Sequence, residues 1–290
     1  MDNTLESIVK RKIEDLKDVH FQEFVNKLYS VYYSNFVVVK QKHDKGADGI
    51  INNNTVIACY APEKHILNNF KKKINCEKID SRGDFQKYRD NWQTDYPNWQ
   101  IVYNGEWTAE MIQFVQNLKK ETELVGLPRI LQMFQELTWT KRKQLFDYLN
   151  IDDKYHANDI ISEIVDDIIK ENENLKGERV KYESPILEKK ISVNYSQEDL
   201  DLAQIEVESF YQNAHIISEI IGENTDKQTI LLTKVIKDYN ATNQDFIFKE
   251  RKKLLIEKYA KDKIIDDYYC HYINNLLLYV FEKCLIGKKP

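Results

Sequence analysis

The sequence predicts a mixed α/β fold, in which an N-terminal sheet flanked by helices is followed by an all-helical region. Three observations lead to this prediction. Short β-branched and aromatic runs are concentrated in the first 125 residues. Apolar residues at helical spacing dominate the rest of the chain. Only 8 Gly and 5 Pro occur among 290 residues, so long loops should be few.

The N-terminal region has an element order that suits a small sheet covered by helices. Residues 4–32 carry apolar positions at helical spacing, which predicts one long helix or two helices that are separated near Asp18. Thr108 is expected to cap the last helix of the region. The expected strands are 35–40, 50–51, 55–60 and 99–104, and the later helices are 63–95 and 108–121.

The C-terminal region is expected to contain only helices. The periodic segments are 128–150, 158–173, 197–221, 226–240 and 246–285. Residues 178–195 contain Pro185 and alternate weakly, so we expect an extended connection there. The predicted domains are therefore 1–124 and 127–290.

Composition narrows the class of protein. Hydrophobic residues make up 42% and charged residues 31%, which is the balance of a soluble globular chain. No apolar run reaches 18 residues, and the N-terminus lacks the apolar core of a signal peptide, so we expect a cytoplasmic protein without a membrane segment. The four cysteines form no CxxC pair and are expected to be reduced, buried thiols: Cys59, Cys76, Cys270 and Cys284.

The distribution of charge bears on nucleic-acid binding. Residues 1–125 hold 18 of the 42 basic and 18 of the 47 acidic residues, which leaves 24 basic and 29 acidic residues for 126–290. The net charge of −5 therefore belongs to the second region. Because a protein that grips duplex DNA alone usually has a basic face, we expect DNA binding to depend on partners.

Two carboxylates lie where a metal-dependent nuclease needs them. Glu23 is on the first helical segment beside its apolar stripe, and Asp48 follows the first strand and opens the second. A third position falls at the end of the next strand, on 58–60. Phosphodiester cleavage with Mg²⁺ needs such oxygen ligands to converge, and a lysine nearby to orient the attacking water. We expect Glu23 and Asp48 to meet at one edge of the sheet.

The segment 44–63 resembles a group of PD-(D/E)xK nuclease domains. The residues that carry the resemblance are the Asp-Gly turn at 48–49 and the Tyr-Ala-Pro block at 60–62. Lys78-Ile79, Asp84-Phe85, Trp92 and the strand that ends in Asn104 then follow in the order of that group. The resemblance covers residues 18–120. It implies the restriction-endonuclease fold and Mg²⁺-dependent DNA cleavage, with Asp48 and Glu23 as metal ligands.

The same resemblance leaves the catalytic lysine and one ligand open. Ala58 stands where relatives have a polar glutamine, and Tyr60 stands where nucleases usually have a lysine. Lys78, or one of the three lysines at 71–73, could replace that lysine from the following helix. Lys71, Lys72 and Lys73 are also candidates for phosphate contacts, against the alternative of a solvated helix face.

The C-terminal region is similar to the C-terminal domain of bacterial ABC-three-component systems. The similarity lies in 188–194 and in the aromatic ending 268–288. Such systems, of which Lamassu anti-phage defence is one, pair this domain with an SMC-like ABC ATPase and a small middle component. The resemblance implies an effector that its helical domain holds on a DNA-sensing ATPase.

Three functions compete at this point. The chain could be an active nuclease effector, or a degenerate nuclease domain that is kept as a structural or regulatory subunit, as Ala58 and Tyr60 favour. A stand-alone Mrr-like restriction enzyme is disfavoured by the acidic second region. Asp44 and Glu63 are interpreted as a turn residue and a helix-start carboxylate. Cys59 has no histidine near it in the sequence, and Cys270-His271 is too small a ligand set for zinc.

Overall fold

A computed structural model divides the chain into two compact units, Met1–Ile151 and Asp152–Pro290. It describes residues 3–40, 45–78, 82–170, 187–222, 225–283 and 285–289. None of the helices within these ranges is long and apolar enough to span a bilayer. Each unit is considered by itself below.

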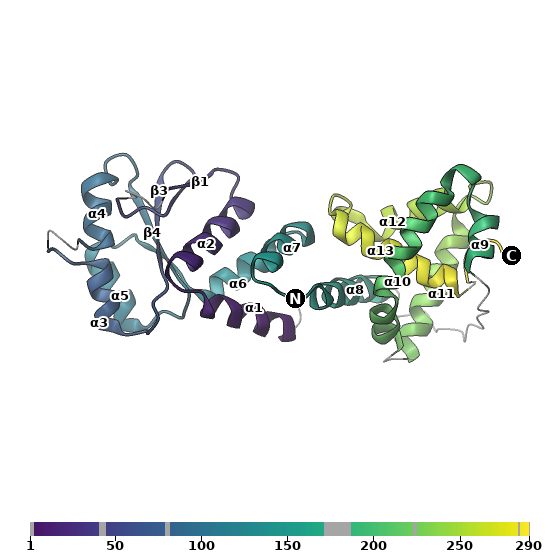
Figure 1. Ribbon diagram of the computed structural model, residues 1–290, viewed down its shortest axis with the longest axis horizontal. Helices are drawn as coiled ribbons and strands as arrows, with labels where there is room; N and C mark the ends of the chain where they lie inside the picture. The colour runs from purple at the N-terminus through teal and green to yellow at the C-terminus, as the bar shows by residue number, and fades with distance from the viewer. Residues whose placement is uncertain are drawn as a thin grey trace. The chain divides into compact units, whose positions relative to one another are not determined.

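The first unit is a five-stranded mixed sheet between two sets of helices (Figure 1). Its helices are α1 (Asn3–Asp15), α2 (Asp18–Tyr32), α3 (Leu67–Ile74), α4 (Asp84–Asn91), α5 (Ala109–Leu118), α6 (Leu127–Glu136) and α7 (Trp139–Tyr148). Its strands are β1 (Phe36–Val38), β2 (Gly49–Ile51), β3 (Thr55–Tyr60), β4 (Asn98–Tyr103) and β5 (Glu123–Val125).

The strands lie in sequence order across the sheet, and β3 is its centre. β1, β2 and β3 are antiparallel neighbours, whereas β3, β4 and β5 run parallel. Six residue pairs join β3 to β4, from Thr55 opposite Asn98 to Tyr60 opposite Tyr103. A central parallel strand is buried on both faces, which explains why β3 is an apolar run.

Alternate residues of β3 and β4 bury two separate cores. Ile57 and Val102 face α1, α2, α6 and α7, where Phe24 stacks on Phe134 with ring centroids 6.0 Å apart. The opposite face packs Trp99 against Tyr88 of α4, together with residues of α3 and α5. Figure 1 shows α3, α4 and α5 on one side of the sheet and α2 on the other.

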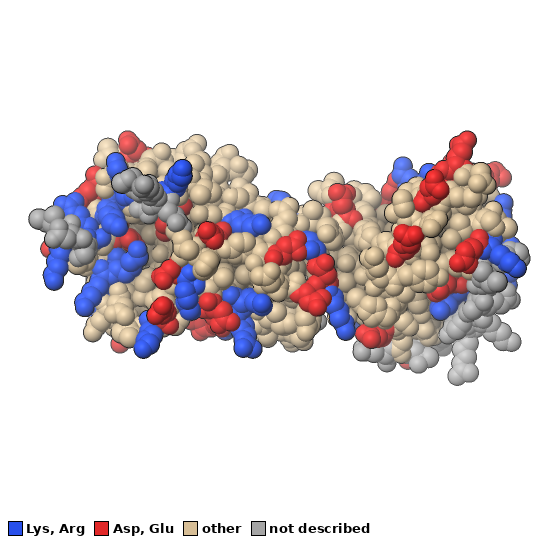
Figure 2. Space-filling view, viewed as in Figure 1, with Lys and Arg blue, Asp and Glu red and all other residues tan. Residues whose placement is uncertain are grey.

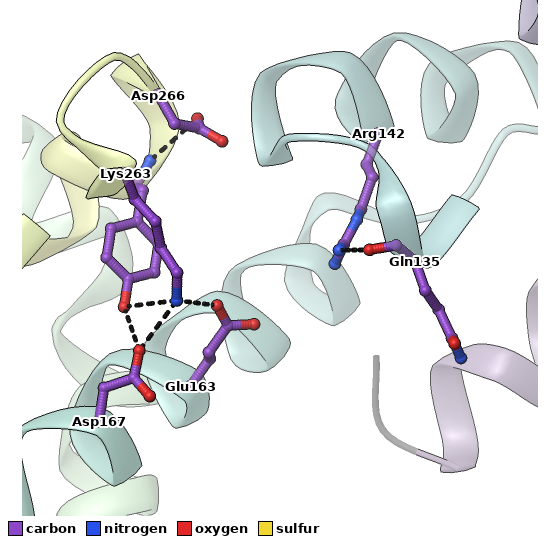
Figure 3. A network of polar contacts seen from close by, with 7 residues as sticks. Gln135, Arg142, Glu163, Asp167, Lys263 and Asp266 are labelled. Carbon is purple, nitrogen blue, oxygen red and sulfur yellow. Dashed lines mark hydrogen bonds and ion pairs between the residues drawn. The ribbon is translucent and has the colours of Figure 1, made fainter. Parts of the chain in front are cut away.

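The second unit contains only helices within the part of it that the structure describes. They are α8 (Asp153–Lys170), α9 (Leu187–Asn194), α10 (Leu200–Gly222), α11 (Thr225–Ala241), α12 (Phe248–Ala260) and α13 (Asp267–Glu282), with 3-10 turns η2 (Gln197–Asp199) and η3 (Lys261–Lys263). Figure 3 shows how polar contacts join them: Lys263 donates to Glu163 and Asp167 of α8, and Tyr269 of α13 donates to the same Asp167.

The sequence-based predictions agree with the mixed α/β class and with the four expected strands. Asp18 separates α1 from α2 as expected, because its φ of 44° breaks the helix. Thr108 caps α5, where its side chain accepts from the amide of Met111. These elements are the ones whose local residue pattern is unambiguous.

Three predictions require correction. The boundary expected at 124–127 lies at Ile151 because α6 and α7 pack on α1 and α2 of the first unit. The helix expected over 63–95 is two helices, α3 and α4. Leu187–Asn194 is helical rather than extended, and the rest of that predicted connection lies outside the described residues. The sequence analysis also missed β5, which is only three residues long.

The aromatic stack between α2, α6 and α7 yields a test of the boundary. Phe134 is fully buried and contacts both Phe24 and Phe146. We expect Phe134→Ala to lower the free energy of unfolding by about 3–5 kcal/mol, since it removes a large buried ring. Urea unfolding that is followed by tryptophan fluorescence measures the change. Val37→Ala, at a site that is 52% exposed, is the control and should change stability by less than about 0.5 kcal/mol.

Candidate functional site

Asp48 lies at the edge of β3, just where β2 begins. Its backbone still belongs to the sheet, because its amide donates to Ile57 at 2.8 Å. Two residues further along β3, the Asp48 carboxylate accepts the amide of Cys59 at 2.6 Å. The carboxylate therefore takes the place of a strand partner where β2 and β3 part, and its position is fixed by the sheet.

The loop before Asp48 is held from α4 and from the turn that follows it. Trp92 donates its indole N–H to the carbonyl oxygen of Lys45 at 3.1 Å. Gly46 has a φ of +81°, and a Cβ there would lie 2.6 Å from Cβ of Lys87. Only glycine satisfies both the left-handed backbone and the close approach. Trp92 and Gly46 thus both hold the backbone of the segment that leads to Asp48.

A second carboxylate, Asp84, lies beside this loop. It begins α4, its side chain is only 7% exposed, and Lys73 of α3 approaches it at 3.2 Å. A Cβ on Gly46 would lie 3.3 Å from the carbonyl oxygen of Asp84, so the start of α4 touches the Asp48 loop. Sequence analysis quoted Asp84 only as part of a motif. An acid directly after Gly83, within the helix predicted over 63–95, was the signal in the sequence that could have identified it.

The pKa of the Cys59 thiol depends on the charges of this cluster. Burial raises the pKa of Cys59 well above its ordinary value, and the carboxylates of Asp48 and Asp84 raise it further. Lys73 acts in the opposite direction on the same pKa. Two acids and one lysine therefore lie close enough to one thiol to influence it. The thiol stays protonated at neutral pH, which agrees with its interpretation as a core residue rather than a nucleophile.

The sequence predicted that Glu23 and Asp48 would meet, and the structure shows Glu23 in contact with other neighbours. Phe21, Phe24 and Val25 turn toward the core, which leaves Glu23 on the exposed flank of α2. Its carboxylate accepts from the hydroxyl of Tyr148 in α7 at 3.4 Å and lies 3.7 Å from the ring of His20. Asp84, rather than Glu23, is the acid whose backbone lies beside the Asp48 loop.

The lysines proposed from the sequence have different surroundings. Lys73 pairs with Asp84, whereas Lys71 lies over the ring of Phe114 with its Nζ 5.6 Å from the centroid. Lys72 and Lys78 are exposed. Figure 2 shows basic side chains gathered over the end of the first unit that carries α3 and α4. Asp44, the turn residue that was weighed as a minor ligand, lies outside the described residues.

The two departures from the nuclease pattern, Ala58 and Tyr60, are both buried on the α3 and α4 face of the sheet. Ala58 offers no ligand atom. The ring of Tyr60 packs against Phe70 and Tyr103, with centroids 5.3 and 5.6 Å away. A lysine at this position would place its charge among these rings. The packing explains why the chain carries an aromatic residue here rather than a lysine.

A small pocket lies next to Tyr60, at the carboxyl ends of the parallel strands β3 and β4. It has a volume of about 110 Å³ and includes His65, Tyr103, Thr108 and Met111 in its lining. His65 Nδ1 and the hydroxyl of Tyr103 are 2.5 Å apart. Burial raises the pKa of Tyr60 to about 12, with a contribution from Tyr103, so its phenol is neutral at physiological pH.

Asn104, which ends β4, has a structural explanation. Its side-chain amide donates to the carbonyl oxygen of Leu16 at 2.8 Å and to that of Glu14 at 3.3 Å. These carbonyls lie where α1 ends and need donors. Asn104 therefore ties the end of β4 to the turn between α1 and α2 rather than facing the Asp48 cluster.

No group of three or more His, Cys, Asp or Glu side chains within the described ranges has an arrangement that could hold a metal ion by itself.

Comparison of the chain with protein-family models, with curated proteins and with solved structures finds no significant match. The resemblances to PD-(D/E)xK nuclease domains and to ABC-three-component systems are therefore proposals.

Two buried tyrosines give a matched test of the site's hydrogen bonds. Tyr29 donates to Gln100 Oε1 at 2.8 Å, whereas the hydroxyl of Tyr60 is buried and has no partner among the described residues. We expect Tyr29→Phe to lower the free energy of unfolding by about 1–3 kcal/mol, because it leaves the buried Gln100 oxygen unpaired. Tyr60→Phe should change it much less. Urea titration of both variants decides the matter, and an equal loss would show that Tyr60 has a bound partner.

Proposed function

We propose that the first unit is a metal-dependent DNA nuclease domain of the restriction-endonuclease type, and that the second unit assembles it with an ABC ATPase. The observation that supports the nuclease best is the cluster at the edge of β3: the Asp48 carboxylate, with the Asp84–Lys73 pair beside its loop. The element order α2-β1-β2-β3-α3-α4-β4, with β3 central, is compatible with that fold.

The carboxylates of Asp48 and Asp84 would suit Mg²⁺ if DNA supplied further oxygen ligands. Mg²⁺ keeps several waters and usually binds through one or two carboxylates together with substrate phosphates. Asp48 and Asp84 provide two carboxylates, and no third protein ligand is required when DNA supplies oxygens. When bound, the cation would lower the pKa of a water and offset the charge that develops on the phosphate. We therefore expect weak metal binding without DNA.

The chain's own residues would divide the remaining tasks. The sheet holds Asp48 through the Cys59 amide, so the carboxylate does not need to reorganise. Lys73 sits against Asp84 and is the lysine best placed to orient water or contact a phosphate oxygen. Lys78, another candidate from the sequence, is exposed and would contact DNA only at the surface. The exposed carboxylate of Glu23 would be repelled by the phosphates.

A second function is favoured by Ala58 and Tyr60. If the cluster no longer supports cleavage, the first unit would be a degenerate nuclease domain that serves as a structural or regulatory subunit. The aromatic packing of Tyr60 against Phe70 and Tyr103 is the specific observation in its favour. Both versions share the same partner and differ only in catalysis.

We assign the whole chain to a bacterial anti-phage defence complex of the Lamassu or ABC-three-component kind, acting in the cytoplasm. The support is the similarity of 188–194 and 268–288 to the C-terminal domain of such systems. An SMC-like ABC ATPase and a small middle component would be the partners. Because the first 125 residues are electrically neutral, most of the affinity for DNA would come from the ATPase.

Cleavage is tested with a matched set of acid-to-amide variants. Asp48→Asn keeps an oxygen for the Cys59 amide but removes the charge, and we expect it and Asp84→Asn to reduce plasmid nicking with Mg²⁺ or Mn²⁺ by at least about 100-fold. Asp95→Asn, an exposed acid of the same unit, is the control. The assay uses the full chain with its partner complex. If the wild-type complex does not cut and Asp48→Asn still protects cells, the degenerate version holds.

The partner is tested independently of cleavage. We expect a gene for an ABC ATPase to lie next to the gene for this chain, and its product to co-purify with the tagged full chain. Asp48→Asn should leave co-purification unchanged, since Asp48 belongs to the first unit. An unrelated gene neighbourhood together with a failure to co-purify would contradict the assembly role, whatever the nuclease assay shows.

A further inference from the structure

A groove runs between α9 and α10 of the second unit. Its volume is about 440 Å³, and it is lined by apolar side chains with a polar rim. The apolar lining comprises Leu187, Ile191, Leu200, Val207 and Tyr211. Tyr211 is 52% exposed although it is a large aromatic residue on a helix that packs against its neighbours. Apolar grooves with a polar rim commonly mark contact sites between proteins.

The rim of the groove is acidic. Glu188 of α9 and Glu208 of α10 belong to its lining, and none of the described residues that line it is Lys or Arg. Burial raises the pKa of Tyr211, and the carboxylates of Glu282 and Glu188 raise it further, which shows that negative charge faces this ring. The groove would therefore attract a positively charged group beside an apolar one.

The surrounding sequence reinforces this charge. Between Lys190 and Lys227 the chain has eight Asp and Glu residues and neither Lys nor Arg. Two of these acids are neutralised within the unit, because Asp199 pairs with Lys249 and Glu206 with Lys252 of α12. Glu208 instead accepts a hydrogen bond from the neutral side chain of Gln204 at 3.2 Å. Glu282, the other acid that acts on Tyr211, pairs with Lys283 at 3.6 Å. The acids that line the groove itself, Glu188 and Glu208, are therefore the ones that supply its negative charge.

We propose that this groove binds a short amphipathic helix of a partner protein, with apolar side chains in the groove and Lys or Arg residues against Glu188 and Glu208. This inference rests on the proposed role of the second unit in assembly and adds the surface and the chemistry of the partner. Nucleic acid and anionic lipid are excluded as occupants because their charge has the same sign as the rim.

The geometry favours a helix over an extended segment. The groove is bounded by two helices, and the described residues of the second unit contain no strand whose edge could pair with an extended chain. A third helix can pack along two others when its apolar residues fall at i, i+3, i+4 and i+7. The charged residues on either side of that stripe would then reach the two glutamates.

The test uses two synthetic peptides with the full chain. One is a labelled 16-residue helix with Leu at i, i+3, i+4 and i+7 and with Lys at the positions that flank this apolar stripe. The second peptide has Glu in place of every Lys. We expect fluorescence anisotropy to show binding of the Lys peptide alone. Tyr211→Ser and Glu208→Lys should each weaken it by at least about tenfold, as for a central aromatic anchor and a reversed charge.

Two variants elsewhere in the unit serve as matched controls. Ile265→Ser changes an apolar residue that is 82% exposed, and Asp262→Lys reverses an exposed acid. Both should leave the affinity for the Lys peptide unchanged. The proposal would be overturned if the Glu peptide bound equally well or if the control variants weakened binding equally. It would also be overturned if the wild-type chain were a dimer in sedimentation and Tyr211→Ser dissociated it. That last result would identify a second copy of this chain as the occupant.

The experiments distinguish an error in the groove proposal from an error in the proposed function. If the ATPase co-purifies with wild type and equally with Tyr211→Ser and Glu208→Lys, the assembly role stands and the groove is not its site. If the Lys peptide binds as expected and no ATPase co-purifies, the groove stands and the assigned partner is wrong.

Discussion

The first unit depends on the way in which β3 is paired. One edge of this strand bonds to antiparallel β2 and the other to parallel β4, and both of its faces are covered by helices. Where β2 begins, the carboxylate of Asp48 bonds the amide of Cys59 in place of a backbone partner. An otherwise unpaired strand amide at a buried edge is costly, so this acid stabilises the sheet even before any function is considered.

The same arrangement defines what the site can do. Asp48 has a fixed position, because its backbone amide bonds to β3 and its loop is held by Trp92 and Gly46. Asp84 and Lys73 come from the two helices that cover this face, so their positions depend on helix packing rather than on the strands. A site that combines one rigid acid with a carboxylate–lysine pair from adjacent helices is compatible with a nuclease that has moved its lysine. A degenerate domain would keep the bond between Asp48 and the Cys59 amide for the stability of the sheet alone.

The second unit poses a different problem, since its function would be to hold another protein. Its internal contacts use paired charges, such as Lys263 between Glu163 and Asp167, which orient α8 against the turn before α13 (Figure 3). The groove between α9 and α10 lacks such pairing and combines apolar lining with excess negative charge. Catalysis and assembly would thus reside in separate units, and a defect in one need not affect the other.

The sequence by itself determined the mixed α/β class, four of the five strands, the break at Asp18, the cap at Thr108 and the candidacy of Asp48, because each depends on residues that are neighbours along the chain. Only the tertiary structure decided that α6 and α7 belong to the first unit, that Glu23 faces α7, and that Asp84 with Lys73 lies beside the Asp48 loop. The reason is physical: local patterns encode dihedral preference and amphipathic faces, whereas these three results depend on how elements from different parts of the chain pack against one another.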